Sequence, residues 1–494
     1  MIKVLWLDIS IDIFKSLFRV ARMEKSKIYF LGHLWLASLM TLMSFLASSS
    51  VAQDTIPRDS VFISRIYEEV LTNSDCYENL RVLCKNVGHR LAGSEGADKA
   101  IAWGQNTLEK YPLDNVSLMP VEVPHWVRGD VEYGYYTCAK DSAIPVAMTA
   151  LGGSVGSKGE ITAEVVEVKS FDELKALGSS NVKGKIVFFN KAMDPMLINT
   201  GAAYGGAYPI RGDGPSEAAR YGAVACLIRS LTLAEDKFAH TGGTHYNDSL
   251  PKIPAAALSS VDSRALSAAL KENPQTTFTI NMSCEAFPRK MQANVIGEIR
   301  GSEFPDQYII VGGHLDSWDI GEGAHDDGTG IVQSIEVLRA LQAVGYKPRY
   351  SIRAVLFINE EFGNDGGETY AAYAKENNLV HIAAIESDGG GFTPRGFGME
   401  GTDAQFSRLE SWKQYLEPYN LHQFRRGHSG VDIRPLKNDR IALFGLIVDN
   451  QRYFDYHHSS NDIFENVNKR ELEMGAASMA ALVYLIDQSA IPAN

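Results

Sequence analysis

A set of histidine and acidic residues in the second half of this sequence offers the donor atoms that divalent metal ions bind. The set comprises His314, Asp326, Glu360, Glu361, Asp388, His457 and His458. Imidazole nitrogens and carboxylate oxygens suit zinc, and a carboxylate can bridge two ions, so two histidines with three carboxylates match a dinuclear zinc site. The adjacent Glu360 and Glu361 add a further function, because neighbouring side chains diverge and one can bind metal while the other stays free as a base.

Most of these residues follow short apolar runs that have the composition of buried strands. The runs and the residues after them are Tyr308–Gly312 before His314, Arg353–Ile358 before Glu360, Ile382–Ile385 before Asp388, and Ile441–Val448 before His458. A His or Asp at a single strand end is commonly a cap or a satisfied loop residue. Open α/β sheets bind ligands at the carboxyl ends of their strands, however, so the recurrence of the pattern predicts one shared site.

The elements that must position this site fall into three regions. Residues 61–110 carry the apolar spacing of two helices, and residues 126–287 form short β-rich runs punctuated by Gly and Pro. After Asn294, strands alternate with helices, which is the pattern of an open α/β sheet interrupted here by a β-rich insert. The predicted boundaries are a signal-peptide region at 1–52, the first part of the catalytic domain at 53–126, the insert at 127–286 and the rest of the catalytic domain at 287–494.

The N-terminal region has the features of an export signal. Ile28–Ala47 is an apolar run that follows two lysines, and Ser50-Val51-Ala52 supplies the small residues of a signal-peptidase site. We expect cleavage after Ala52 and a secreted or periplasmic protein with no stable membrane partner. A retained membrane anchor is the alternative, because a run of this length can span a bilayer.

The composition excludes several classes of protein. Hydrophobic residues at 45% and charged residues at 22% are near the globular average, which argues against a disordered chain or a many-helix membrane protein. The net charge of −13 provides no basic face, so we expect no nucleic-acid partner.

Five scattered cysteines are too few and too far apart to form a metal cage. Two states of Cys76 and Cys84 fit the sequence: a disulfide bridge, or two buried thiols. Arg211-Gly212-Asp213 looks like a cell-adhesion tripeptide, but a polar Gly/Pro loop produces it by chance, so we assign it no function.

Four sequence segments surround the expected site. They are Val311-Gly312-Gly313-His314-Leu315-Asp316-Ser317-Trp318-Asp319, the Gly-Ala-x-Asp-Asp-Gly segment from Gly323, Glu386-Ser387-Asp388, and Phe454-x-x-His457-His458-Ser459. These segments resemble those of the co-catalytic zinc aminopeptidase superfamily, and more narrowly the plasma glutamate carboxypeptidase (carboxypeptidase Q-like) family. The resemblance covers about residues 61–490. It implies an aminopeptidase-like three-layer α/β/α catalytic domain with a mixed sheet, and the insert resembles a protease-associated domain.

The resemblance also implies a metal centre with two Zn²⁺ ions per chain. The implied ligands are His314, Asp326 and Asp388 for one ion, and Asp326, Glu361 and His458 for the other. Asp326 would therefore bridge the two ions. In such enzymes the Asp326–Asp327 peptide bond is often cis.

Three further residues receive roles from the resemblance. Glu360 would be the catalytic general base, Asp316 would orient His314, and Asp462 would do the same for His458. His457 is the rival of His458 as a ligand. The superfamily pattern of His, Ser or Thr, two residues and then Asp begins at His458, which favours His458.

The expected activity is that of a zinc-dependent exopeptidase, a dipeptidase or carboxypeptidase that hydrolyses dipeptides or short peptides. A metal-bridging hydroxide would attack the peptide carbonyl while Glu360 takes the water proton and delivers it to the leaving amine. Small peptides are the expected partners, and a homodimer is compatible with the sequence. An aminopeptidase acting on longer peptides is the main alternative. A non-catalytic receptor-like protein is remote because every ligand position is filled, and a glutaminyl cyclase-like transferase is remote because it would normally lack the insert.

Overall fold

A computed structural model describes residues 58–138, 143–438 and 440–489 of the chain. The predicted signal region at 1–52 lies outside these residues. None of the helices in the described ranges combines the length and the apolar character needed to cross a membrane.

The first sheet carries the strands that the sequence predicts around the site. In spatial order its strands are β1 (Asn115–Val127), β10 (Glu285–Ile299), β12 (Tyr350–Phe357), β11 (Phe304–His314), β13 (Val380–Glu386), β16 (Ala442–Val448), β14 (Pro394–Glu400) and β15 (Gln423–Arg426). The central strands β12, β11, β13 and β16 run parallel. β1 pairs antiparallel with β10, β10 with β12, and β14 with β16, whereas β15 runs parallel to β14. The predicted mixed sheet is confirmed, and the carboxyl ends of the four parallel strands lie at one edge.

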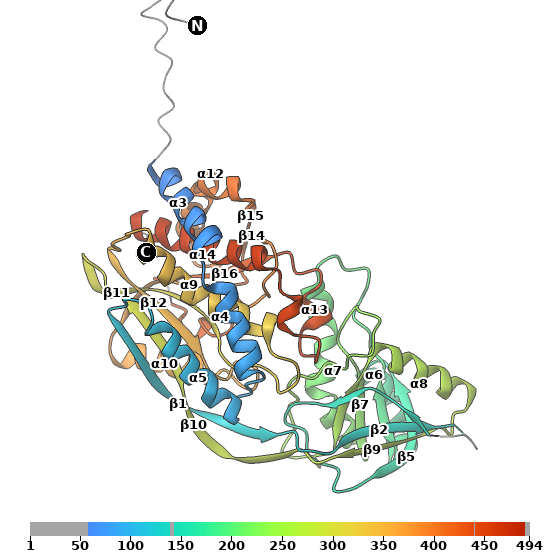
Figure 1. The fold of residues 1–494 in the computed structure, drawn as a ribbon. Coiled ribbons are helices and arrows are strands. Elements are labelled where there is room, and N and C mark those ends of the chain that lie inside the picture. Colours follow the sequence, from blue (N-terminus) through green and yellow to red (C-terminus); the bar gives the residue numbers. More distant parts are fainter. Residues whose placement is uncertain (1–57, 139–142, 439, 490–494) are drawn as a thin grey trace, which may run out of the picture. The chain divides into compact units, whose positions relative to one another are not determined.

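Helices cover both faces of this sheet (Figure 1). Along β11, Ile309 and Val311 belong to one apolar cluster and Ile310 to another, because successive side chains of a strand point to opposite faces. The first cluster includes residues of α3 (Arg58–Asn73), α4 (Cys76–Val82), α5 (Glu95–Leu108), α9 (Thr329–Ala343) and α14 (Lys469–Ser489). The second includes Tyr370 and Ala374 of α10 (Asp365–Glu376). The three-layer α/β/α arrangement is therefore as predicted.

Short helices complete this part of the chain. They are η2 (Leu83–Val87), η3 (Ala324–Gly328), α11 (Asp403–Ser411), α12 (Lys413–Leu416), η4 (Glu417–Tyr419), η5 (Arg434–Leu436), α13 (Tyr453–Tyr456) and η6 (Phe464–Asn466). Between residues 61 and 110 the sequence predicts two helices, but α4 lies between α3 and α5 as a third. It begins where the Ser74 hydroxyl accepts the backbone N–H of Cys76 at 2.9 Å. Cys76 and Cys84 are both buried free thiols, so the structure contains no bridge between them.

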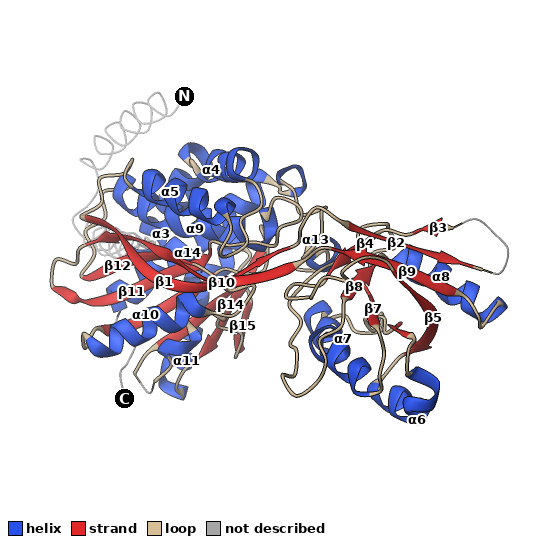
Figure 2. Cartoon of the chain, turned by 90° about the horizontal axis from the view of Figure 1, so that it is seen from below, coloured by secondary structure: helices blue, strands red, loops and turns tan. Residues whose placement is uncertain are grey.

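The second sheet is built from residues between β1 and β10 (Figure 2). In spatial order its strands are β3 (Ile144–Pro145), β2 (Glu132–Thr137), β9 (Thr277–Met282), β5 (Ile161–Val168), β6 (Ile186–Phe189), β7 (Ala225–Arg229), β8 (Ala255–Leu258) and β4 (Met148–Ala150). The helices α6 (Phe171–Val182), α7 (Thr200–Arg220) and α8 (Ser260–Glu272) accompany it. The insert contains these helices as well as the predicted strands, because the parallel neighbours β5, β6 and β7 need long crossover connections. Its likeness to a protease-associated domain stays a prediction.

Helix α7 replaces a loop that the sequence predicts around Arg211. The helix contains Pro209 and Pro215, which remove backbone donors and usually end helices. Packing against the sheet outweighs these local preferences. A Cβ atom added at Gly214 would lie 3.3 Å from the ring of Phe189 in β6, so the small residue permits the close approach of helix and strand.

Candidate active site

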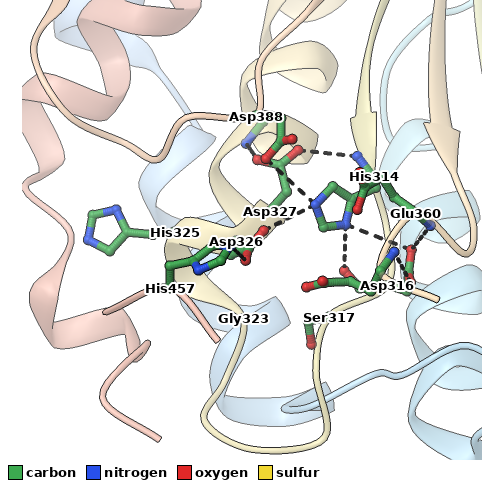
Figure 3. A network of polar contacts seen from close by, with 12 residues as sticks. His314, Asp316, Ser317, Gly323, His325, Asp326, Asp327, Glu360, Asp388 and His457 are labelled. Atoms are coloured by element: carbon green, nitrogen blue, oxygen red, sulfur yellow. Dashed lines mark hydrogen bonds and ion pairs between the residues drawn. The ribbon is translucent and has the colours of Figure 1, made fainter. Parts of the chain in front are cut away.

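The parallel strands of the first sheet bring the predicted site residues together at their carboxyl ends (Figure 3). β11 ends at His314, β12 leads into Glu360 and Glu361, and β13 leads into Asp388. Asp326 lies in η3, between β11 and α9, and His458 follows α13 after β16. Strands that are neighbours in space thus supply residues that are far apart in the sequence.

Asp326 lies between two imidazole rings. Its Oδ1 is 3.2 Å from Nε2 of His314, and its Oδ2 is 3.3 Å from Nε2 of His458. Oε2 of Glu361 lies 3.0 Å from the same atom of His458, and Oδ1 of Asp388 lies 3.7 Å from Nε2 of His314. The five residues therefore form two groups that share Asp326, which is the arrangement a bridging carboxylate requires.

These groups have the properties of a cation site. Within the described residues, Oδ2 of Asp326, Oε1 of Glu361 and Oδ1 of Asp388 are buried without a hydrogen-bond partner. Burying such oxygens without a partner is costly, and divalent cations would remove that cost. Donor atoms of His314, Asp326 and Glu361 all lie within 4.8 Å of one another. With imidazole nitrogens and carboxylate oxygens as donors, this set fits zinc.

Comparison with known proteins identifies the family. The model of "Peptidase family M28" matches residues 294–483, which include every residue of the two groups. Carboxypeptidase Q of Bos taurus is 34% identical over 411 residues, which cover 83% of this chain and 84% of that protein. Carboxypeptidase Q of Xenopus laevis is 36% identical over 411 residues, with 83% and 85% covered. This chain belongs to peptidase family M28.

Solved structures agree with this membership. A peptidase M28 precursor from Shewanella amazonensis SB2B is 30% identical, with a TM-score of 0.84, and the match covers 88% of this chain and 98% of that one. A zinc aminopeptidase from Bacillus subtilis is 21% identical with a TM-score of 0.60, covering 84% and 95%, which shows a shared fold. The protein is a metallopeptidase of a zinc-dependent family.

His457, the rival of His458, also lies close to the shared carboxylate. Its Nε2 is 3.7 Å from Oδ2 of Asp326, and its ring stacks on that of His458 with centroids 3.5 Å apart. Among the ion pairs of the described chain, however, Glu361 pairs with His458 and not with His457. The geometry therefore favours His458 as the residue that joins Asp326 and Glu361.

Asp316 connects His314 to the segment that carries the two glutamates. Its carboxylate accepts the backbone N–H of Glu360 at 3.1 Å and that of Glu361 at 3.3 Å. Nδ1 of His314 lies 3.1 Å from the carbonyl oxygen of Asp316 and 3.7 Å from its Oδ1. Asp316 therefore lies behind His314, but its backbone carbonyl is closer to the ring than the carboxylate that the resemblance implies. The carboxylate orients the start of the segment after β12.

Asp462 has different partners from those that the sequence suggests. Its Oδ1 accepts the backbone N–H of His325 at 2.7 Å, and its Oδ2 accepts that of Asp326 at 3.1 Å. The backbone N–H of Asp462 donates to the carbonyl of Ser459 and closes a turn. In this turn the Asp462 carboxylate points toward η3 rather than toward His458. Asp462 thus positions the backbone of Asp326, the residue that the two groups share. The ring of His458 is held by a different partner.

Two positioning residues are not identified by the sequence analysis. Arg90 is fully buried and donates to the carbonyl oxygens of Leu315 (2.5 Å), Glu322 (2.8 Å) and Gly323 (2.8 Å), so it holds both ends of the loop after His314. An arginine that binds carbonyl groups leaves no spacing signal in a sequence.

The second of these residues is Asp327. Its carboxylate accepts the backbone N–H of Gly330 at 2.9 Å and that of His314 at 3.2 Å, so it joins the start of α9 to the end of β11. Its place beside Asp326 in the Gly-rich segment is a signal that could have marked it. The Asp326–Asp327 peptide bond is cis.

The pKa values of Asp326 and Glu360 are shifted in opposite directions. Burial disfavours the charged form of Asp326, but the neighbouring rings of His314 and His458 hold the pKa of that carboxyl well below its usual range. Burial raises the pKa of Glu360 well above its ordinary value, and the charges of Asp388 and Glu361 add to the rise against the opposing effect of His314. Of the two, Glu360 is therefore the better proton carrier and Asp326 the better permanent anion.

One wall of the site rests on the insert. A cavity beside the shared carboxylate is lined by Trp318, Ile320, Gly323, Asp326, Glu361, His458, Ser459 and Asp462. Trp318 belongs to the apolar cluster of the second sheet. A Cβ atom added at Gly152 of the insert would lie 2.0 Å from the Trp318 ring, so the glycine allows the two parts to meet here.

Proposed function

We propose that this metallopeptidase is an exopeptidase that hydrolyses dipeptides and short peptides with two zinc ions. His314, Asp326 and Asp388 would hold one ion, and Asp326, Glu361 and His458 the other. The observation that carries the proposal is the position of Asp326, whose two oxygens face two different imidazole rings. When bound there, zinc would polarise a peptide carbonyl and lower the pKa of a water molecule toward neutrality.

The chain's own residues would complete the reaction. Glu360 would accept a proton from the attacking water at a carboxylate oxygen and deliver it to the nitrogen of the leaving amine. Asp316 would hold Glu360 in place through its backbone N–H. The raised pKa of Glu360 supports this role, because a carboxyl with a raised pKa takes up a proton more readily than an ordinary glutamate.

The preference for short substrates is supported by the insert. Trp318, in the wall of the cavity, packs against the insert, and Thr241 of the insert is hydrogen-bonded to the backbone of His458 at 2.8 Å. An insert in contact with the site on these two sides would leave little room for a folded protein. Recognition of both ends of a small peptide is therefore the substrate preference that we propose.

Peptides with blocked termini would test this preference. A free dipeptide should be hydrolysed at least about tenfold faster than its N-acetylated or C-amidated forms, because each block removes a charged hydrogen-bonding group that contributes roughly 1.5–3 kcal/mol. Dialysis against a chelator should abolish the hydrolysis, and added zinc should restore it, which ties the measured rate to the metal centre. Faster cleavage of a longer, C-amidated peptide would instead identify an aminopeptidase.

We also propose that the protein acts outside the cytoplasm, on the basis of the apolar run and the small residues near Ala52. Expression of the full chain in a secreting host should yield a mature form whose first residue lies near Gln53. N-terminal sequencing of the exported protein measures this directly. Recovery of the intact chain in the membrane fraction would favour the anchor instead.

A further inference from the structure

Arg211, the first residue of the adhesion-like tripeptide, lies inside the protein. It belongs to α7 and is 4% exposed, whereas Asp213 two residues later is exposed. Its guanidinium lies over the rings of Tyr204 and Tyr208, 5.4 and 5.1 Å from their centroids. The tripeptide therefore cannot present both of its charged side chains to a receptor, and a different role is needed for a buried cation.

The guanidinium of Arg211 reaches the back of the proposed metal centre. Its Nη1 donates to the carbonyl oxygen of Thr241 at 3.3 Å and lies 3.3 Å from Nδ1 of His458. Nδ1 of His458 lies 3.3 Å from the same carbonyl oxygen. Gly242 makes this approach possible, because a Cβ atom there would lie 2.3 Å from the centre of the guanidinium. Arg211, Thr241 and His458 thus form one connected group.

The role of His458 as a zinc ligand determines which of its ring nitrogens carries the proton, because Nε2 faces Asp326 and Glu361 and must keep its lone pair for the metal. A guanidinium can only donate hydrogen bonds, and a carbonyl can only accept them. With the proton on Nδ1, His458 donates to Thr241, and the lone pair of Nε2 points at Asp326 and Glu361, as a metal ligand requires. The backbone N–H of Thr241 also donates to the carbonyl of His458 at 2.8 Å, so the insert fixes this residue at two points.

The charge of Arg211 has no carboxylate to balance it. No ion pair among the described residues includes Arg211, and its Nε is buried without a hydrogen-bond partner. Burying an unpaired cation is costly, so a structural filler at this position would be better served by an apolar side chain. What the cation adds at this position is the hydrogen bond to the Thr241 carbonyl and the contact with the ring of His458.

We propose that Arg211 is a positioning residue of the metal centre, which acts through the carbonyl group of Thr241 to fix the orientation and tautomer of His458. The inference rests on the proposed function, because it takes His458 as a zinc ligand. It makes the insert part of the zinc site as well as a wall of the cavity. Partners of this kind typically change metal affinity by 10- to 100-fold.

Zinc affinity of the purified full chain tests the proposal. Arg211→Met keeps an apolar stem over the tyrosines but removes every donor, and we expect competition with a chromophoric chelator to show one zinc ion bound about 10- to 100-fold more weakly. Arg211→Lys, which keeps a cation and one donor group, should lose less. Arg220→Met is the matched control in the same helix, because Arg220 is exposed and pairs with Glu217. It should leave zinc affinity unchanged.

A double-variant cycle separates this role from a general loss of structure. In a His458→Gln background, Arg211→Met should change zinc affinity less than about twofold, because the residue through which Arg211 acts is gone. Equal losses in both backgrounds, or a raised KM with unchanged zinc affinity, would overturn the proposal. Unchanged affinity in Arg211→Met and Arg211→Lys beside a loss in His458→Gln would overturn this inference alone. Unchanged affinity in His458→Gln would overturn the proposed metal site together with it.

Discussion

Asp326→Asn is expected to be the most damaging single change in the site, with a fall in kcat/KM of at least roughly 10³-fold. The substitution keeps the size of the side chain but removes the charge that lies between His314 and His458. Both groups of ligands share this carboxylate, so both zinc ions should be held more weakly. Lewis-acid stabilisation contributes several kcal/mol to metal-dependent hydrolysis, and each 1.36 kcal/mol corresponds to a factor of about ten.

Metal analysis of the purified variant beside its kinetics measures this effect. Asp449→Asn offers a matched control, because Asp449 follows β16, is partly exposed and pairs with Arg395. The control should keep full zinc content and rate. Normal metal content and activity in Asp326→Asn would show that the two groups do not form the centre.

The strand ends of the first sheet are the part of the site that sequence can predict. Each strand has a buried apolar run, and parallel neighbours end at one edge, so the positions of His314, Glu361 and Asp388 follow from the order of the elements. The assignment of each ligand to one of two ions, and of Glu360 as the base, follows from the resemblance to a family and not from this pattern. The strand-end positions and the family motifs can both be recognised in the sequence, because both consist of residue types at short, regular spacing.

Contacts between distant backbone groups are the part that sequence cannot predict. His458 meets the carbonyl of Thr241, which is 217 residues away, and any residue type could supply that carbonyl. Asp462 likewise accepts backbone N–H groups of η3, and every non-proline residue has such a group, so the residue types do not identify this pair. Such bonds depend on the path of the whole chain.

Helix α7 shows the same limitation at the level of secondary structure. Its prolines and glycines predict a loop by local preference, yet residues 200–220 form one helix. The helix is favoured because Ala218, Ala219 and Ile210 are buried in an apolar cluster with the second sheet. Arg211 is carried toward His458 only by this helix, which is why the sequence gives no hint of its position.

Two neighbouring substitutions should separate proton transfer from metal binding. Glu360→Gln keeps the size and a hydrogen-bonding amide but cannot take a proton, so zinc content should persist while kcat falls by at least roughly 10²-fold. Glu361→Gln removes a charge that faces Nε2 of His458 at 3.0 Å, so this variant should lose zinc as well as rate. The matched control is Glu368→Gln in α10, an exposed glutamate that should show neither effect.

The two glutamates are distinguishable because their surroundings differ. Burial raises the pKa of both carboxyls, and the charges of Asp388 and Glu361 add to the rise at Glu360, whereas Glu361 has a direct imidazole partner in His458. Excess zinc in the assay should therefore recover part of the rate of Glu361→Gln and none of that of Glu360→Gln. Zinc loss in Glu360→Gln with full occupancy in Glu361→Gln would reverse the two roles. Normal dipeptide hydrolysis by both variants would place the active site elsewhere in the protein.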